Sequence, residues 1–201
     1  MDYCEGGELL TFISDEDGLS EKQTATIIHQ AMYALSYLHV NKICHRDIKP
    51  ENFLLFKKGD INHIKMIDFG LAVKKKDPKE EMHTLAGSPF YIAPEVLKGQ
   101  YTISCDNWSM GVLMYVMLAG KYPFSKNEDQ DMEDLFENIK TAKYDLESEF
   151  WNEISESAKD LIRKLLERDT DKRLTALEAM NHEWMKNAKE EKMKSFRLGS
   201  R

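Results

Sequence analysis

The chain has little cysteine and no long apolar run, and each shortage excludes a class of protein. Its three cysteines, Cys4, Cys44 and Cys105, are widely spaced and show no pairing pattern, so they do not form the framework of a small disulfide-rich domain. We therefore expect reduced thiols in an intracellular protein. The longest apolar stretch, at 111–120, falls far short of the roughly 20 residues that span a bilayer, so no membrane segment is expected.

Positive charge is also scarce. With 28 basic and 35 acidic residues the net charge is −7, which argues against an extended nucleic-acid-binding surface and favours partners that carry basic residues. A hydrophobic fraction of 42% with 31% charged residues is ordinary for one globular domain. The sequence contains no internal repeat and no low-complexity linker. We expect a cytoplasmic protein, with the nucleus as the alternative location.

Apolar residues recur mainly at helical spacing. Short apolar runs at 53–56 and 64–67 flank a turn-forming Lys58-Gly59-Asp60 and predict a β-hairpin. The segment 104–119 is apolar on all sides, which is typical of a buried central helix. Helices are expected at 8–13, in a long segment capped by Ser20, and at 104–119, 131–141, 155–166 and 175–181. The sequence thus predicts a mainly α domain with a small β-hairpin.

Three short motifs carry chemistry. The run His45-Arg46-Asp47-Ile48-Lys49-Pro50-Glu51-Asn52 is followed by Asp68-Phe69-Gly70 and then by Ala93-Pro94-Glu95. In this order they resemble the catalytic-loop, magnesium and activation-segment signatures of the eukaryotic protein kinase family. The resemblance implies the large C-terminal lobe of the α+β kinase fold. It also implies a Ser/Thr protein kinase that uses ATP and Mg²⁺.

The resemblance assigns roles in phosphoryl transfer, where positioning and charge neutralisation do most of the work. Asp47 would orient the substrate hydroxyl and accept its proton. Lys49 would contact the γ-phosphate and marks a Ser/Thr kinase, while Asn52 and Asp68 would each hold a magnesium ion. Ser88 replaces the family's usual Thr but keeps the hydroxyl that should bond Asp47 and Lys49. The alternative is a charged loop that pairs only with itself.

The first ten residues resemble the hinge of kinases and the start of its following helix. On this interpretation the backbone of Asp2 and Cys4 would bind the adenine edge, and Glu8 would reach the ribose. Leu54 would form the floor of the adenine pocket, and Ile67 would line it just before the magnesium motif.

Only 44 residues precede His45, and they contain no Gly-rich phosphate loop. We therefore expect the N-terminal ATP-binding lobe to be missing and the isolated chain to be inactive or very weak. The expected organisation is a hinge at 1–10, the kinase C-lobe at 11–186 and a basic tail at 187–201. The alternative function is a non-catalytic or truncated kinase lobe that acts as a protein-binding module.

Substrate choice and regulation also follow from the resemblance. Glu8 and Glu51 would bind an arginine upstream of the phosphoacceptor, because a carboxylate can hold a guanidinium bidentately. The alternatives are a ribose contact for Glu8 and a solvated charge for Glu51. Thr84 aligns with the activating phosphothreonine of many kinases, and Arg46 with its partner; the alternative is an ordinary surface loop. Protein substrates with upstream basic residues are expected.

Three charged residues are expected to hold the lobe together. Glu95 and Arg173 match a buried ion pair of the family. Asp106 would bond backbone near the catalytic loop, since a carboxylate directly ahead of an apolar helix is costly unless it is paired. Asn107, the next residue, is unusual at this place.

Segments at 5–9, 91–97 and 182–184 resemble the calcium/calmodulin-dependent kinase group, which includes the calcium-dependent kinases. The stretch from Asp129 to Lys140 lacks the glycine and final glutamate of an EF-hand. Calmodulin or a regulatory segment would therefore act from outside this chain.

Overall fold

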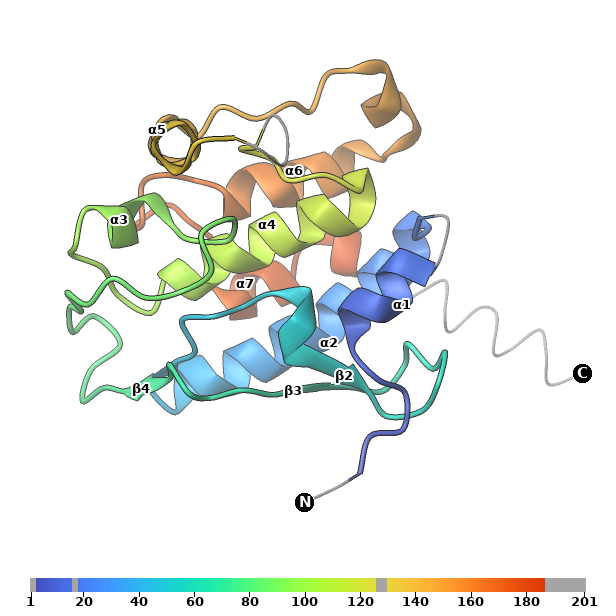
Figure 1. Cartoon of the computed structure of the whole chain (residues 1–201), viewed down its shortest axis with the longest axis horizontal. Coiled ribbons are helices and arrows are strands. Elements are labelled where there is room, and N and C mark those ends of the chain that lie inside the picture. Colours follow the sequence, from blue (N-terminus) through green and yellow to red (C-terminus); the bar gives the residue numbers. More distant parts are fainter. Residues whose placement is uncertain (1–2, 16–17, 126–129, 187–201) are drawn as a thin grey trace, which may run out of the picture.

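A computed structural model describes residues 3–15, 18–125 and 130–186, and two long helices lie at its centre (Figure 1). The first, α2 (Glu21–Val40), starts at a capping box in which Ser20 and Gln23 bond each other's backbone N–H. Its buried residues recur every three or four positions, so one side faces the core. Asp2 and the expected basic tail at 187–201 lie outside the described residues.

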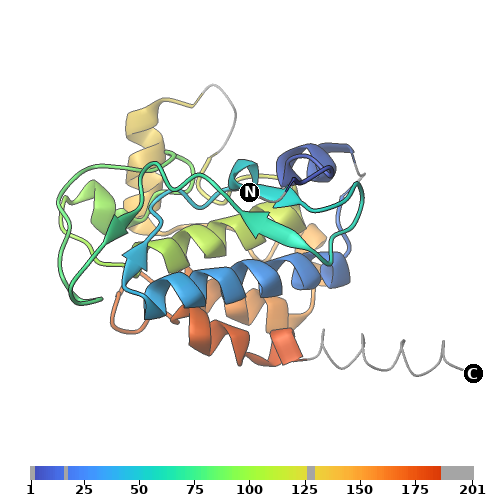
Figure 2. The ribbon, with the colours of Figure 1, turned by 90° about the horizontal axis from the view of Figure 1, so that it is seen from below.

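The second central helix, α4 (Cys105–Ala119), is buried on nearly all sides, as its sequence predicts. It ends at Gly120, whose φ of 65° is left-handed and suits a residue without a side chain. Figure 2 shows α2 and α4 running side by side. No helix in the described ranges is long and apolar enough to cross a bilayer.

The remaining helices surround this pair, and every helix expected from sequence is present with ends within two residues of the prediction. The α6 helix packs on α4, and the last helix packs on α2. In chain order they are α1 (Leu9–Asp15), the 3₁₀ turn η1 (Pro50–Asn52), α3 (Pro94–Leu97), α5 (Met132–Thr141), the 3₁₀ turn η2 (Glu149–Glu153), α6 (Glu156–Leu165) and α7 (Ala176–Met180).

The expected hairpin is present and carries the site at its ends. Strands β2 (Phe53–Leu55) and β3 (Ile64–Met66) pair antiparallel. The N-terminal segment lies along β2, because the N–H of Gly6 donates to the carbonyl of Leu55 at 3.1 Å. A side chain at Gly6 would lie 2.5 Å from Cβ of Leu55, so only glycine allows this close approach.

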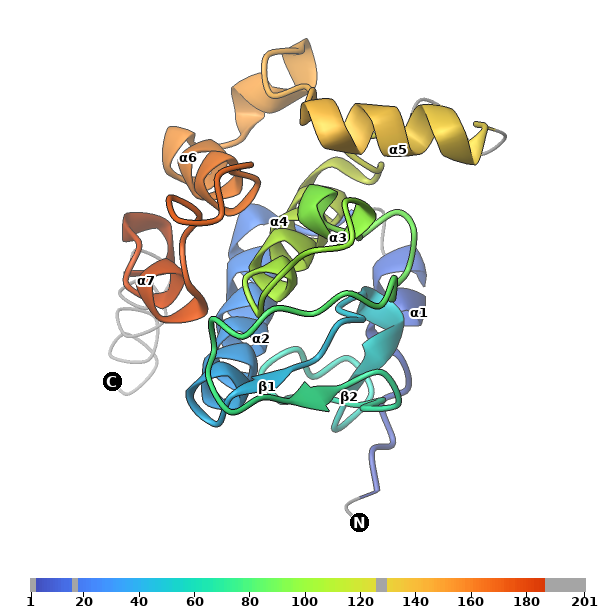
Figure 3. The same ribbon diagram turned by 90° about the vertical axis from the view of Figure 1, so that its left-hand side faces the viewer.

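A second two-stranded sheet was not expected. Strand β1 (Ile43–Cys44) pairs antiparallel with β4 (Val73–Lys74). Each strand has two residues, too few for an alternating pattern to be visible in the sequence. Figure 3 shows that β1 and β2 lie at one end of the molecule and α5 at the other.

Two cysteines that are distant in sequence lie side by side in the core. The Sγ atoms of Cys44 and Cys105 are 3.6 Å apart and both thiols are free. The hydrogen bond between Cys44 and Cys105 and burial raise the pKa of the Cys44 thiol. Both therefore act as small, protonated core residues between β1 and α4.

The expected ion pair of Glu95 and Arg173 joins α3 to the loop before α7. The guanidinium donates two bonds to the carboxylate, of 2.5 and 2.9 Å. It also donates to the carbonyl of Ser104 at 3.1 Å and lies over the ring of Trp108. A buried charge held from several sides is expensive to unpair.

We expect Arg173→Met to lower the free energy of unfolding by about 3–5 kcal/mol, because it leaves the Glu95 carboxylate buried without its partner. Urea unfolding followed by circular dichroism measures this loss. The neighbouring Lys172→Met is the control, since that side chain is 75% exposed and its loss should cost within about 0.5 kcal/mol. Equal effects of the two changes would contradict the assignment.

Candidate active site

The carboxylate of Asp47 lies at the centre of a network of hydrogen bonds. Its Oδ1 accepts from the backbone N–H of Ser88 at 3.1 Å and from the Ser88 hydroxyl at 2.8 Å. Its Oδ2 accepts from the Asn52 amide at 3.0 Å and lies 3.0 Å from Nζ of Lys49. Lys49 also donates to the Ser88 hydroxyl at 2.9 Å. The contacts expected for Ser88 are therefore present.

These contacts control the charge of Asp47. Burial by itself raises the pKa of the carboxyl group, but the hydrogen bonds from Ser88, Lys49 and Asn52 and the positive charge of Lys49 outweigh it. The net effect lowers the pKa of Asp47 below its usual range. The group is therefore an ionised acceptor at neutral pH.

The loop that carries Asp47 is held in place by the side chain of Asp106, at the start of α4. This carboxylate is 1% exposed and accepts from the backbone N–H groups of His45 and Arg46, both at 2.8 Å. The ring of His39 also donates to it at 3.0 Å. Arg46 has a φ of 68°, a strained conformation for a side chain of this size. The hydrogen bonds from the two backbone N–H groups to Asp106 hold this turn in place.

The backbone just before Asp68 places this residue next to the catalytic loop. The N–H of Ile67 donates to the carbonyl of Asn52 at 2.9 Å, and the His45 ring donates to the carbonyl of Ile67 at 3.2 Å. Asp68 then takes a left-handed φ of 60°, and its Oδ1 accepts from the N–H of Gly70 at 3.1 Å. The aspartate of the second motif is thus fixed next to Asn52.

The donor set fits a magnesium ion. Because the Asn52 side-chain nitrogen donates to Asp47, its oxygen is the atom that can bind a metal. Asp68 adds an exposed carboxylate. An amide oxygen and a carboxylate are the hard ligands that Mg²⁺ prefers.

A glycine allows the segment that carries Ser88 to approach the catalytic loop. Gly87 has a φ of 113°, and a side chain there would lie 2.7 Å from the carbonyl oxygen of Arg46. Only glycine tolerates both conditions. Motifs that lie 41 residues apart in sequence therefore meet around one carboxylate.

Comparison with known proteins agrees with this geometry. The model of the protein kinase domain matches residues 1–185. The chain belongs to the protein kinase family. It is 46% identical over 189 residues to calcium-dependent protein kinase 3 of Plasmodium berghei (strain Anka), covering 94% of this chain and 34% of that protein.

Two further relatives place the chain more narrowly. It is 44% identical over 189 residues to calcium-dependent protein kinase 29 of Arabidopsis thaliana, covering 94% of this chain and 35% of that protein. It is 41% identical over 187 residues to human death-associated protein kinase 2, covering 92% and 50% respectively. The expected calcium/calmodulin-dependent group is thereby confirmed. The chain spans a third to a half of the length of these relatives.

The kinase activation segment is tied to the catalytic loop by a tyrosine that sequence analysis missed. The Tyr101 hydroxyl accepts from Arg46 at 3.2 Å and donates to the carbonyl of Thr84 at 2.6 Å. Arg46 also donates to the carbonyl of Leu71 at 2.7 Å. Thr84 itself is exposed. The two residues expected to act in regulation are thus linked through Tyr101, and their role stays a prediction.

The residues expected at the adenine end lie close to the hairpin. Glu8 forms an isolated antiparallel bridge with Leu54, which places the first kinase helix beside β2. Leu54, Ile67 and Cys4 are half-buried and Glu8 is exposed. The structure brings Glu8 and Leu54 together, and nucleotide binding by these residues stays a prediction.

The two carboxylates expected to read the substrate differ in surroundings. Glu8 is exposed, whereas Glu51 is half-buried in η1. The Oε2 atom of Glu51 is buried and has no hydrogen-bond partner within the described residues. A buried carboxylate oxygen without a donor is costly, and binding of a substrate arginine by Glu51 stays a prediction.

The network at Asp106 predicts how stability depends on pH. Burial raises the pKa of Asp106, but the bonds from His39, His45 and Arg46 outweigh it and lower the pKa below that of the unfolded chain. The stabilisation is therefore complete above the unfolded pKa of about 4 and is lost as the pH falls through the folded pKa.

We expect Asp106→Asn to be less stable than the natural chain at neutral pH and to lose less stability as the pH falls from about 5 towards 3. Urea unfolding at a series of pH values measures both effects. Asp171→Asn, at an exposed position, is the control and should follow the natural chain. A parallel pH profile for the Asp106 variant would contradict the role given to this carboxylate.

Proposed function

We propose that this chain supplies the catalytic and protein-binding half of a serine/threonine protein kinase that transfers the γ-phosphate of ATP. The support is the Asp47 carboxylate, which is ionised, buried and held between Ser88, Lys49 and Asn52. A carboxylate in this state can orient a hydroxyl and accept its proton. The family membership makes a protein side chain the source of that hydroxyl.

The neighbours of Asp47 have separate tasks in this proposal. The Ser88 hydroxyl donates to Asp47 and accepts from Lys49, which fixes both side chains before the substrate arrives. Lys49 would neutralise charge on the transferred phosphoryl group, as phosphoryl transfer requires. Asn52 and Asp68 would hold Mg²⁺, which neutralises phosphate charge when bound.

Nucleotide binding by the 201 residues alone is proposed to be weak, because the sequence ahead of His45 contains no Gly-rich phosphate loop and kinases need both lobes for transfer. The second candidate is a protein-binding lobe without catalysis. Joining the chain to an ATP-binding lobe separates the two candidates. A suitable lobe is that of the 46% identical Plasmodium berghei kinase.

We expect this fusion to phosphorylate a serine peptide and the isolated chain to do so negligibly. In the fusion, Asp47→Asn should lower kcat by about 10²- to 10⁴-fold, because it removes the proton acceptor. Radiolabelled phosphate transfer measures the rate, and calorimetry measures Mg-ATP binding.

Asp134→Asn is the matched control, since this carboxylate is exposed on α5 and its loss should leave kcat unchanged. A fusion that folds and binds Mg-ATP but transfers no phosphate would favour the non-catalytic candidate. Near-normal turnover by a folded Asp47 variant would show that another group accepts the proton.

We also propose that substrates carry a basic residue upstream of the phosphoacceptor. The half-buried carboxylate of Glu51, whose Oε2 has no hydrogen-bond partner within the described residues, supports this, because an arginine can donate two bonds to one carboxylate. The exposed carboxylate of Glu8 would add to the attraction. The net charge of −7 favours the approach of a basic peptide over a wide range.

For the fusion we expect Glu51→Gln to raise KM for a peptide with an upstream arginine by about 10-fold or more, since the charge-assisted bond is lost. A peptide with alanine in place of that arginine should show no such change. Glu153→Gln, at an exposed position, is the control. If both peptides respond equally to Glu51→Gln, this carboxylate does not read the arginine.

Calcium control is proposed from the names of the relatives, two of which are calcium-dependent kinases. A calcium-binding or calmodulin-binding segment outside this chain would carry it. Phosphorylation of Thr84 would add charge close to Arg46, through the link formed by Tyr101. A cytoplasmic or nuclear location agrees with free, protonated thiols in the core.

A further inference from the structure

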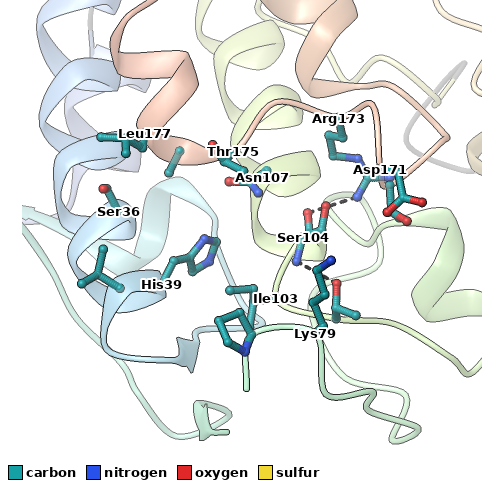
Figure 4. Close-up of a pocket in the computed structure, with 15 residues that line it drawn as sticks. Ser36, His39, Lys79, Ile103, Ser104, Asn107, Asp171, Arg173, Thr175 and Leu177 are labelled. Carbon is teal, nitrogen blue, oxygen red and sulfur yellow. Dashed lines mark hydrogen bonds between the residues drawn. The ribbon is translucent and has the colours of Figure 1, made fainter. Parts of the chain in front are cut away.

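A pocket of about 510 Å³ has a lining that includes none of the residues bonded around Asp47 in the active site. Figure 4 shows the side chains that surround this pocket. It is bounded by the end of α2, the start of α4, the loop at 170–175, the start of α7 and two residues of the activation segment, Pro78 and Lys79. Val40, Ile103 and Leu177 give it apolar walls. Its volume is within the range of small-molecule sites.

One buried polar atom in the lining of the pocket has no partner within the described residues. Asn107 lines the pocket and is 3% exposed. Its Oδ1 is buried without a hydrogen bond in the described part of the chain. The preceding residue, Asp106, is by contrast bonded from three sides. Buried polar atoms in folded proteins are nearly always paired, so the unpaired Oδ1 of Asn107 indicates a missing donor.

We propose that this pocket binds a small molecule that joins an apolar ring to a primary carboxamide or a similar edge. Such an edge places an N–H donor beside a carbonyl acceptor. It can therefore pair with the complementary edge of the Asn107 side chain. The ring would lie against Val40, Ile103 and Leu177, where the hydrophobic effect favours it.

The position of the pocket gives the site a route to the catalytic loop. His39, which lines the pocket, donates to Asp106. Arg173, also in the lining, holds Glu95. A bound molecule would thus touch the residues that fix the catalytic loop and the end of the activation segment. Its binding does not depend on the proposed kinase activity.

Benzamide titrated into the 201-residue chain tests the site directly. Calorimetry should show saturable binding, and the side-chain amide signal of Asn107 in ¹⁵N spectra should shift with the same concentration dependence. Acetophenone has a similar shape but no N–H, so it should bind at least about 10-fold more weakly.

Two variants locate the bound molecule. Asn107→Leu keeps the side-chain volume and removes the amide, so benzamide affinity should fall by about 10-fold or more, and by more than the affinity for acetophenone, which loses only one hydrogen bond. Ser36→Phe, on the α2 wall of the pocket, places a ring in the cavity and should abolish binding of both. Asn152→Leu, at an exposed position outside the lining, is the matched control and should change neither.

Three results would overturn the proposal. Benzamide that fails to saturate would show a pocket filled by water alone. Equal affinity for benzamide and acetophenone would show that no donor meets Asn107. Benzamide binding that survives Ser36→Phe would place it elsewhere on the chain. Because Ser36→Phe alters the wall and not the core, the test stands even if Asn107→Leu fails to fold.

Discussion

Two hydrogen bonds to one buried carboxylate determine the shape of the site. Asp106 accepts from the amides of His45 and Arg46, and burial without these donors would cost several kcal/mol. The carboxylate and the turn therefore stabilise each other. The two amide N–H groups compensate the burial of the charge, and the charge holds Arg46 in its left-handed conformation. Asp47 follows directly, so its direction is set by the start of α4.

The activation segment is attached to this turn at several points. Ser88 bonds Asp47 at one point, and Gly87 allows that contact by bringing two backbones together. Tyr101 provides a second attachment through Arg46, and the Glu95–Arg173 pair anchors the end of the segment to the core. Thr84 is exposed and lies upstream of Ser88, after the pairing of β4 with β1. A segment fixed at its ends and exposed in the middle suits a regulated loop.

Asp106 and Asn107 are neighbours on α4 and are both buried, but their side chains differ in hydrogen bonding. Asp106 has all its bonds within the protein, and its charge makes the fold dependent on pH. Asn107 is equally buried but neutral, and its carboxamide faces a pocket. A neutral unpaired group costs less than a charge, so the fold can tolerate it and a ligand can use it.

The sequence by itself determined the family, the helices and the hairpin. Helical periodicity, the Ser20 cap and the turn at Lys58-Gly59-Asp60 act over a few residues, so they are visible without the fold. The motif residues Asp47 and Asp68 were identified from the resemblance of their motifs to the protein kinase family. The contact of Ser88 with the first of them followed from the family resemblance.

Only the tertiary structure decided which distant residues meet. Tyr101 contacts Arg46, which lies 55 positions away in sequence, and Cys44 contacts Cys105, which lies 61 positions away. The two-residue strands β1 and β4 pair only because the catalytic loop and the activation segment pass each other there. The unpaired Asn107 is visible only once its neighbours are known. Local sequence patterns determine the helices and the hairpin, because the interactions that form them act between residues close in sequence. Burial and pairing depend on packing, which no short stretch of sequence contains.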